Sequence, residues 1–96
     1  MTAEELQLRL GVVIRYYRER KGYSQEGFSD SIDIHQTHYG AVERGHQNVT
    51  LKMLKLIADG LEIPVWKLLH EAVTKQPSDF PEPRKPGRPR GSKRLR

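Results

Sequence analysis

The chain has 96 residues, a length that predicts one compact domain and argues against a multidomain enzyme. It contains no cysteine, which excludes a disulfide framework, a thiolate zinc site and a cysteine nucleophile, and no apolar run approaches the roughly 20 residues that span a bilayer. The net charge of +5 is uneven: residues 84–96 hold seven basic side chains and no acid, whereas residues 1–83 hold 10 basic and 12 acidic side chains, a net charge of −2. We therefore expect a cytoplasmic protein without a membrane segment, whose C-terminal segment meets a polyanion.

The first predicted helix covers residues 3–21. Its start is indicated by Thr2 and Glu5, which have the spacing of a capping box that satisfies two free N–H groups. Gly22 is expected to end this helix as a left-handed cap. Between these signals, apolar side chains recur with helical spacing at Leu6, Leu10, Val13, Ile14 and Tyr17.

Two short helices are predicted next, over residues 25–31 and 36–44. Ser24 is a favourable N-cap for the first of them, and Asp33 lies in the turn between them, where a residue that tolerates positive φ is needed. Gly40 falls in the middle of the second helix and costs about 1 kcal/mol relative to alanine. Packing or a partner is therefore required to hold this helix.

Two further helices are predicted over residues 51–61 and 64–74. Thr50 can cap the fourth helix, and Pro64 suits the first turn of the fifth, where its missing N–H is no loss. Trp66 in the fifth helix has two interpretations, a core side chain in a monomer or an aromatic anchor between two subunits. No segment has the alternating pattern of a strand, so the predicted fold class is all-α.

The composition changes at residue 76. Residues 76–96 hold five of the six prolines and almost no aliphatic side chains, so they cannot bury enough apolar surface to offset their conformational entropy. We expect a helical domain over residues 1–75, followed by a flexible, disordered basic tail over residues 76–96.

Two short motifs, with the hydrophobic residues around them, carry a family resemblance. Ser24-Gln25-Glu26 opens the second helix, and Glu43-Arg44-Gly45 closes the third, nineteen positions later. Over about residues 8–70 the chain resembles the Cro/CI-type (Xre family) helix-turn-helix domain of bacterial and phage repressors. The resemblance implies a five-helix, lambda-repressor-like fold and a sequence-specific DNA-binding transcriptional regulator at the bacterial nucleoid. The helix over about residues 36–44 would then lie in the major groove.

The resemblance also implies roles for individual side chains. Gln36 is the strongest candidate for reading a base, because a glutamine amide can make two hydrogen bonds to adenine. The residues implied to face the bases are Gln36, Thr37, His38, Gly40 and Ala41. The residues implied to bind phosphate are Gln25, Arg15, Arg44, Asn48 and Lys52. His35 departs from the family pattern, in which a small hydroxyl residue caps the third helix.

The basic tail resembles a second DNA-binding element, the AT-hook of high-mobility-group A proteins. Its core is Gly87-Arg88-Pro89, with Lys85 or Arg90 as the second basic arm, since Pro86 occupies the position where arginine is usual. Glycine and proline keep such a chain narrow, and arginine enters the minor groove of A·T tracts. The alternative is a plain basic tail that only adds phosphate contacts.

The sequence also predicts an oligomeric state and a structural role for Glu43. One short recognition helix reads too few bases to select a genomic site, so we expect a homodimer. The candidate interface is the fifth helix, through Val65, Trp66 and Leu69. Glu43 is interpreted as a structural anchor that holds the helix end through backbone or arginine contacts, since a carboxylate repels phosphate.

Enzyme chemistry is not indicated. The sequence has no phosphate-cradling glycine loop and no catalytic arrangement of carboxylates with histidine. Its four histidines are scattered over different elements, so no metal site is expected. Nor do we expect a cofactor or a small-molecule substrate; the expected partners are double-stranded DNA and a second copy of the chain. The alternative function is an antitoxin or adaptor-like protein-interaction module, which the charge of −2 outside the tail leaves open.

Overall fold

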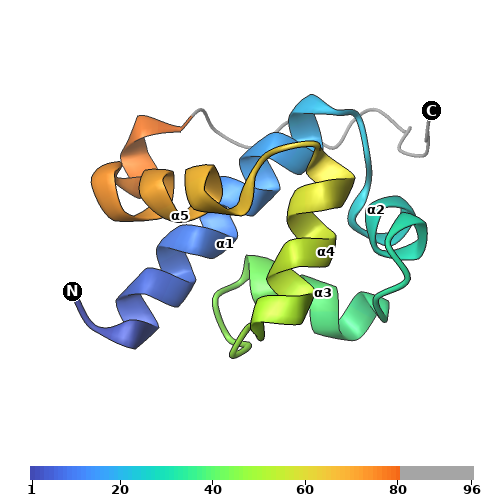
Figure 1. The fold of residues 1–96 in the computed structure, drawn as a ribbon, viewed down its shortest axis with the longest axis horizontal. Helices are drawn as coiled ribbons and strands as arrows, with labels where there is room; N and C mark the ends of the chain where they lie inside the picture. The colour runs from blue at the N-terminus through green and yellow to red at the C-terminus, as the bar shows by residue number, and fades with distance from the viewer. Residues whose placement is uncertain (81–96) are drawn as a thin grey trace.

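The computed structural model describes residues 1–80, which form five α-helices and one short 3-10 helix (Figure 1). The elements are α1 (Ala3–Arg20), α2 (Gln25–Ser31), α3 (Gln36–Glu43), α4 (Leu51–Leu61), α5 (Val65–Thr74) and η1 (Pro77–Asp79). Residues 1–80 contain no strand, so the predicted all-α class and its five helices are confirmed. The tail residues assigned to the minor groove, Lys85, Gly87, Arg88, Pro89 and Arg90, lie outside the described residues.

The helices begin where side chains cap their free N–H groups. The Glu5 N–H donates to Thr2 Oγ1 at 3.0 Å, as the capping box predicts. Ser24 and Thr50 cap α2 and α4 in the same way. The fifth helix starts one residue later than predicted, because Pro64 is its N-cap and does not belong to its first turn.

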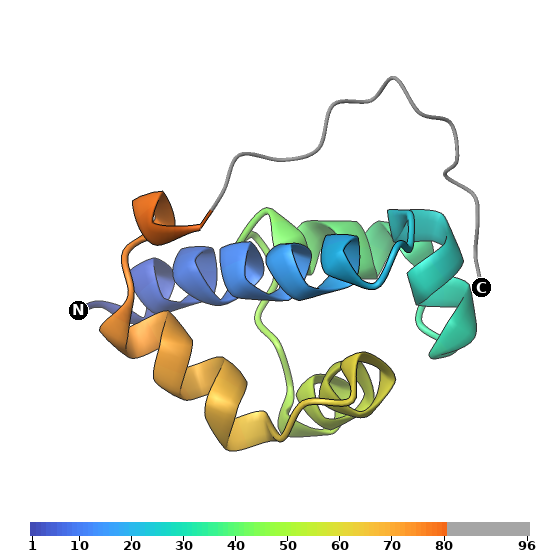
Figure 2. The same cartoon turned by 90° about the horizontal axis from the view of Figure 1, so that it is seen from above.

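The long helix α1 runs along the molecule and the other elements pack around it (Figure 2). The view shows α3 on one side of α1 and the pair α4 and α5 on the other, with α2 beside the C-terminal end of α1. The third helix is therefore held against one side of α1, and α2 packs mainly on α3 at the end of α1.

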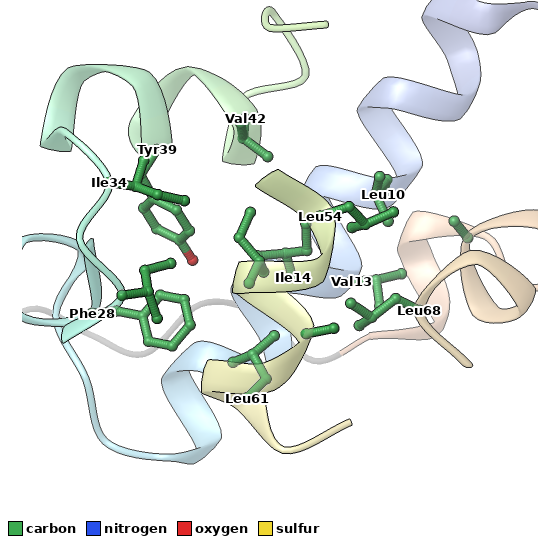
Figure 3. Close-up of a cluster of buried hydrophobic side chains, with 14 residues drawn as sticks. Leu10, Val13, Ile14, Phe28, Ile34, Tyr39, Val42, Leu54, Leu61 and Leu68 are labelled. Carbon is green, nitrogen blue, oxygen red and sulfur yellow. The ribbon is translucent and has the colours of Figure 1, made fainter. Parts of the chain in front are cut away.

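Side chains from all five helices meet in one core (Figure 3). Each helix contributes at least one side chain with 0% exposure, and examples in chain order are Ile14, Phe28, Tyr39, Ile57 and Leu68. Burying a side chain of this size stabilises a fold by roughly 1.5–3 kcal/mol. No helix can therefore be removed without opening this core.

Two residues other than glycine end helical segments with positive φ. Asp33 has φ 60° in the turn between α2 and α3, where a residue that tolerates this conformation was predicted. Glu62, with φ 62°, ends α4 in the left-handed conformation, although Gly60 is nearby. Gly60 serves packing, because a Cβ there would lie 2.5 Å from Ile32 Cγ2.

The proline-rich segment begins with residues that pack on α1. After η1, the Phe80 ring lies 5.0 Å from the Tyr16 ring, measured between centroids. Arg9 Nη1 donates to the Lys75 carbonyl oxygen at 3.1 Å, which holds the end of α5 to α1. Residues 76–80 were expected to belong to a disordered tail. The structure differs, because Phe80 packs on the aromatic ring of Tyr16 in α1.

None of the helices in residues 1–80 combines the length and apolar character needed to cross a membrane. Within the same residues, no three side chains of histidine, aspartate or glutamate come together in a way that could hold a metal ion.

Candidate nucleic-acid interface

The N-terminal half of α3 displays three consecutive polar side chains. Gln36, Thr37 and His38 are exposed, whereas the next residue, Tyr39, is completely buried. The helix begins at this point because His35 Nδ1 accepts from the Thr37 N–H at 3.2 Å. The ring nitrogen of histidine thus caps the helix at the position where the resemblance implies a small hydroxyl side chain.

The residues in the second turn of α3 are half-buried or buried, unlike the exposed residues of its first turn. Ala41 is half-buried, and Gly40 is buried beneath two side chains, Gln25 and Arg44. A Cβ at Gly40 would lie 3.4 Å from Gln25 Oε1 and 3.2 Å from Arg44 Nη1. The assignment of Gly40 to the residues that face the bases stays a prediction; in the free chain Gly40 is buried.

A buried ion pair connects α1 to the end of α3. Arg18 Nε and Nη2 donate to the two carboxylate oxygens of Glu43 at 2.7 and 2.9 Å. Both residues are less than 10% exposed. The prediction that Glu43 anchors the helix end through an arginine is therefore confirmed. Such a pair is stabilising only where its remaining hydrogen-bonding groups find partners.

Those partners come from every part of the helix-turn-helix unit. Arg18 Nη1 donates to the Tyr23 carbonyl oxygen at 2.8 Å, in the loop before α2. The Tyr39 hydroxyl donates to Glu43 Oε2, and Gln25 Nε2 donates to Glu43 Oε1 at 2.8 Å. The network therefore fixes α1, α2 and α3 relative to one another.

Burial and neighbouring charges shift the pKa values of Tyr39 and Arg18 in this network. Burial raises the pKa of Tyr39 well above its ordinary value of 10.0, and the neighbouring Glu43 charge raises it further. For Arg18, burial lowers the pKa, but the hydrogen bonds and the charge of Glu43 outweigh that effect and raise the pKa above its ordinary value. Tyr39 is thus a neutral donor beside a charged arginine at neutral pH.

The remaining residues predicted to bind phosphate lie on α1, in the segment that follows α3, and in the first turn of α4. Arg44 is exposed at the C-cap of α3, and Arg15 is half-buried on α1. Asn48 and Lys52 are exposed on either side of Thr50, where α4 begins. Among the five predicted phosphate ligands, the structure brings Gln25 and Arg44 close to one point, above Gly40.

Comparison with known proteins places this arrangement in a family. A helix-turn-helix family model matches residues 14–65, which is more than half of the chain. The chain belongs to the Cro/CI-type (Xre) helix-turn-helix family. The matched residues begin within α1 and end at the start of α5, so they include the whole buried network around Glu43.

Other members of the helix-turn-helix family include control proteins and transcriptional regulators. The chain is 41% identical to control protein C.SmaI of Serratia marcescens over 56 residues, which are 58% of this chain and 67% of that protein. It is 34% identical to control protein C.MunI of Mycoplasma sp over 68 residues, which are 70% of this chain and 92% of that protein. The regulator SlrR of Bacillus subtilis is 33% identical over 60 residues, which are 62% of this chain and 40% of that protein.

Solved structures with the same fold include a restriction-modification controller protein. The crystal structure of wild-type C.Esp1396I matches with a TM-score of 0.65 and 30% identity, covering 73% of this chain and 96% of that chain. The C.Esp1396I tetramer in complex with its natural 35 base-pair operator matches with the same TM-score, identity and coverage. These structures share the helix-turn-helix arrangement described above.

Outside the helix-turn-helix unit, α5 carries an apolar stripe on its outer face. Trp66 is 66% exposed and Val73 is 52% exposed, whereas Val65 and Leu69 are half-buried and also pack against the core. The Trp66 ring is packed only partly, with its centroid 6.3 Å from that of His70. The interpretation of Trp66 as a core side chain is therefore wrong, and the interface interpretation stays a prediction.

A second buried carboxylate, which no pattern in the sequence identified, holds α5 to α1. Glu71 is only 7% exposed and accepts from the Tyr17 hydroxyl at 2.8 and 3.0 Å. Burial, followed by the hydrogen bond to Glu71, raises the pKa of Tyr17 to about 12. One signal was available: Glu71 lies three positions after buried Leu68, within the inner stripe of the helix.

Proposed function

We propose that this chain is a sequence-specific DNA-binding transcriptional regulator that inserts α3 into the major groove. The observation that carries the proposal is the exposed triplet Gln36, Thr37 and His38 on a helix held by a buried charge network. Readout of base edges requires polar side chains on a rigid element that fits the groove. The similarity to a controller protein solved in complex with its operator supports the same use of this fold.

In this proposal the exposed residues divide into two roles. Gln36 reads a base, assisted by Thr37 and His38, and Ala41 approaches a thymine methyl group. The phosphate ligands are Gln25, Arg15, Arg44, Asn48 and Lys52, which come from α1, α2 and the segment from the end of α3 to the first turn of α4. Phosphate contacts set the register of α3 on the duplex, and base contacts select the sequence.

The proposed regulator acts as a homodimer joined through α5. Two copies of α3 read two half-sites, which compensates for the few bases that one short helix can contact. The exposed indole of Trp66, with Val65 and Leu69, provides the apolar surface for the contact. The similarity to the C.Esp1396I tetramer supports assembly of this fold into oligomers.

The basic tail is proposed to add contacts in the minor groove. Lys85, Gly87, Arg88, Pro89 and Arg90 form the AT-hook-like element, and Phe80 fixes the point on α1 from which the chain continues toward it. The competing outcome is a plain polycation that binds phosphate without preference for A·T flanks.

Selection of binding sites from a random DNA pool tests the proposal. The full chain should enrich a symmetric site in duplex DNA, and the Gln36→Ala variant should fail to enrich the same site. Residues 1–80 alone should retain salt-dependent binding to that site. Complete indifference of residues 1–80 to DNA would favour the antitoxin or adaptor function instead.

The kind of regulated gene can be proposed from the relatives. Two control proteins and a restriction-modification controller protein are among the similar proteins, which supports a role in controlling restriction-modification genes. The selected site should then occur upstream of such genes. If it does not occur there, the chain regulates other genes.

A further inference from the structure

The first turn of α3, which displays the exposed polar triplet, begins at a histidine that caps it twice. The Thr37 N–H donates to His35 Nδ1 at 3.2 Å, and the Tyr39 N–H donates to the His35 carbonyl oxygen at 3.0 Å. The Thr37 N–H is one of the first N–H groups of the helix, which have no acceptor within the helix itself. His35 therefore supplies both a side-chain and a backbone acceptor at the start of this turn.

The cap of α3 differs chemically from the side-chain caps of α1, α2 and α4. Thr2, Ser24 and Thr50 accept through hydroxyl oxygens, which remain acceptors at any pH near neutrality. A histidine ring nitrogen accepts a hydrogen bond only while it carries no proton, and histidine ordinarily changes its charge between pH 5 and 8. Of these four caps, only the cap of α3 can therefore be removed by a proton in that range.

The His35 ring is exposed and belongs to no ion pair within residues 1–80. The helices that pack on α3 are α1 and α2. The charged and titratable side chains around this turn are Glu26 and Asp30 on α2, Asp33 in the turn, Arg18 on α1, and His38, Glu43 and Arg44 on α3 and its C-cap. A proton on the His35 ring would remove the acceptor and also place positive charge at the positive end of the α3 dipole. Both effects weaken the first turn.

We infer that His35 is a positioning residue whose neutral ring holds the first turn of α3 in the conformation that reads bases. A proton on Nδ1 removes the acceptor of the Thr37 N–H and loosens this turn. The second turn stays in place, because Tyr39 and Glu43 are joined there within the buried network. Selectivity for the specific DNA site therefore falls as the pH falls. The inference rests on the proposed function, in which the first turn of α3 reads bases.

The ratio of the affinities for the selected site and for an unrelated duplex, measured from about pH 8 to about pH 5.5, tests the inference. Taking the ratio removes the general attraction of added positive charge to phosphate, which strengthens binding to both duplexes. For the wild-type chain the ratio should fall about three- to tenfold over this range, the size expected for the loss of a helix cap. A ratio that stays constant or rises would overturn the inference.

Two matched variants separate the cap from other effects of pH. In His35→Asn the side-chain oxygen can cap the helix but does not titrate, so the ratio should stay close to the wild-type value at pH 8. In His35→Ala no acceptor remains, so the ratio should already be about three- to tenfold lower at pH 8. Both variants keep His38 and the other titratable groups. A fall in His35→Asn as large as in the wild-type chain would assign the pH dependence to another group and overturn the inference.

A measurement without DNA distinguishes a failure of this inference from a failure of the proposed function. In NMR relaxation measurements on the free wild-type chain, the backbone of Gln36 and Thr37 should become more mobile as the pH falls over the same range. His35→Ala should show that mobility already at the higher pH, and His35→Asn should keep the turn rigid throughout. Unchanged mobility in the wild-type chain and in His35→Ala would overturn the inference. The expected mobility changes in a chain that binds no DNA would refute only the proposed function.

Discussion

Glu43 accepts hydrogen bonds from Arg18, Gln25 and Tyr39, which together satisfy both of its carboxylate oxygens. This explains how a charged pair can lie inside a domain of this size. The desolvation cost of the two charges is offset only while every partner is present. Removing the carboxylate leaves the buried Arg18 with only the Glu19 carboxylate, 3.9 Å from its Nη2, as a counter-charge.

At this residue, Glu43→Ala should lower the free energy of unfolding by about 3–5 kcal/mol. The matched control is Asp59→Ala, which removes an ion pair of similar length with Lys55, 2.8 Å, whose side chains are 64% and 60% exposed. Exposed pairs of this kind contribute less than about 1 kcal/mol. Urea unfolding of both variants checks the difference, and equal losses would contradict the role assigned to Glu43.

Two tyrosines that donate hydrogen bonds to carboxylates, Tyr17 and Tyr39, predict sensitivity to alkaline pH. Tyr17 has its pKa raised to about 12 by burial and by Glu71, and burial together with Glu43 raises the pKa of Tyr39 as well. Below pH 10 both phenols are protonated in folded and unfolded chains, so their contribution to stability is complete. Above pH 10 the unfolded chain loses these protons first, and the contribution of Tyr17 disappears as the pH rises toward 12.

Urea midpoints measured between pH 8 and pH 11 check this expectation. The wild-type midpoint should fall more steeply above pH 10 than that of Tyr17→Phe, which lacks the titrating phenol. Parallel curves for the two proteins would show that Tyr17 keeps its ordinary pKa in the folded chain.

Among the exposed residues, Gln36 is expected to select sequence. Gln36→Ala should weaken binding to the selected site by about 1–3 kcal/mol and leave binding to unrelated DNA almost unchanged. Lys52→Ala is the control, since removal of a phosphate ligand should weaken both kinds of binding alike. Titrations of both variants on specific and unrelated duplexes measure the ratio, and equal losses for Gln36→Ala would reject the assignment.

At the scale of elements, α5 has two apolar faces with different uses. Its inner face, with Leu68 and Ala72, is completely buried against the core, whereas its outer face leaves Trp66 and Val73 largely exposed. The inner face is needed for folding of the single chain. The outer face is available to a second copy, which the proposed homodimer requires.

Trp66→Ala should therefore shift the equilibrium from dimer to monomer, with little effect on the folding of each chain. An exposed aromatic at the centre of an interface typically contributes about 2 kcal/mol or more, roughly thirtyfold in the dissociation constant. Sedimentation over a range of concentrations measures this shift. A wild-type chain that is monomeric both free and on DNA would contradict the proposed dimer.

The starts of the helices were predictable from sequence because helix caps depend on local interactions. The caps at Thr2, Ser24 and Thr50 were read from side chains within three positions of the N–H groups they satisfy. The contact of Tyr17 with Glu71 was not predictable, because it joins residues 54 positions apart and depends on how two helices cross. The burial of Gly40 was missed for the same reason, since Gln25 covers it from a different helix.

At the scale of the whole molecule, Phe80 is the last described residue and packs on α1 ahead of the basic tail in the sequence. Its ring packs on Tyr16, and the charged Lys75 Nζ lies 5.6 Å from its centroid. The described helices end before the seven basic residues of positions 84–96 begin. A shortened chain should therefore behave differently according to whether it keeps Phe80.

Two truncations check this expectation. Ending the chain after Phe80 should leave the melting temperature unchanged and reduce the slope of log affinity against log salt, by about 0.9 for each phosphate that the tail no longer neutralises. Ending it after Gln76 should reduce the slope equally and also lower the melting temperature, because Phe80 no longer packs on Tyr16. An unchanged salt slope in both would remove the tail from DNA binding.

Because the exposed residues of α3 are separate from the residues that hold it in place, the DNA site that this chain prefers should be changeable by substitution. Gln36, Thr37 and His38 are exposed, whereas Tyr39 and Glu43 hold the helix to its neighbours from the opposite side. A library randomised at the three exposed positions, with proline excluded, should consist mostly of folded members. Selection from such a library should yield variants that prefer new sites without any compensating change elsewhere in the chain.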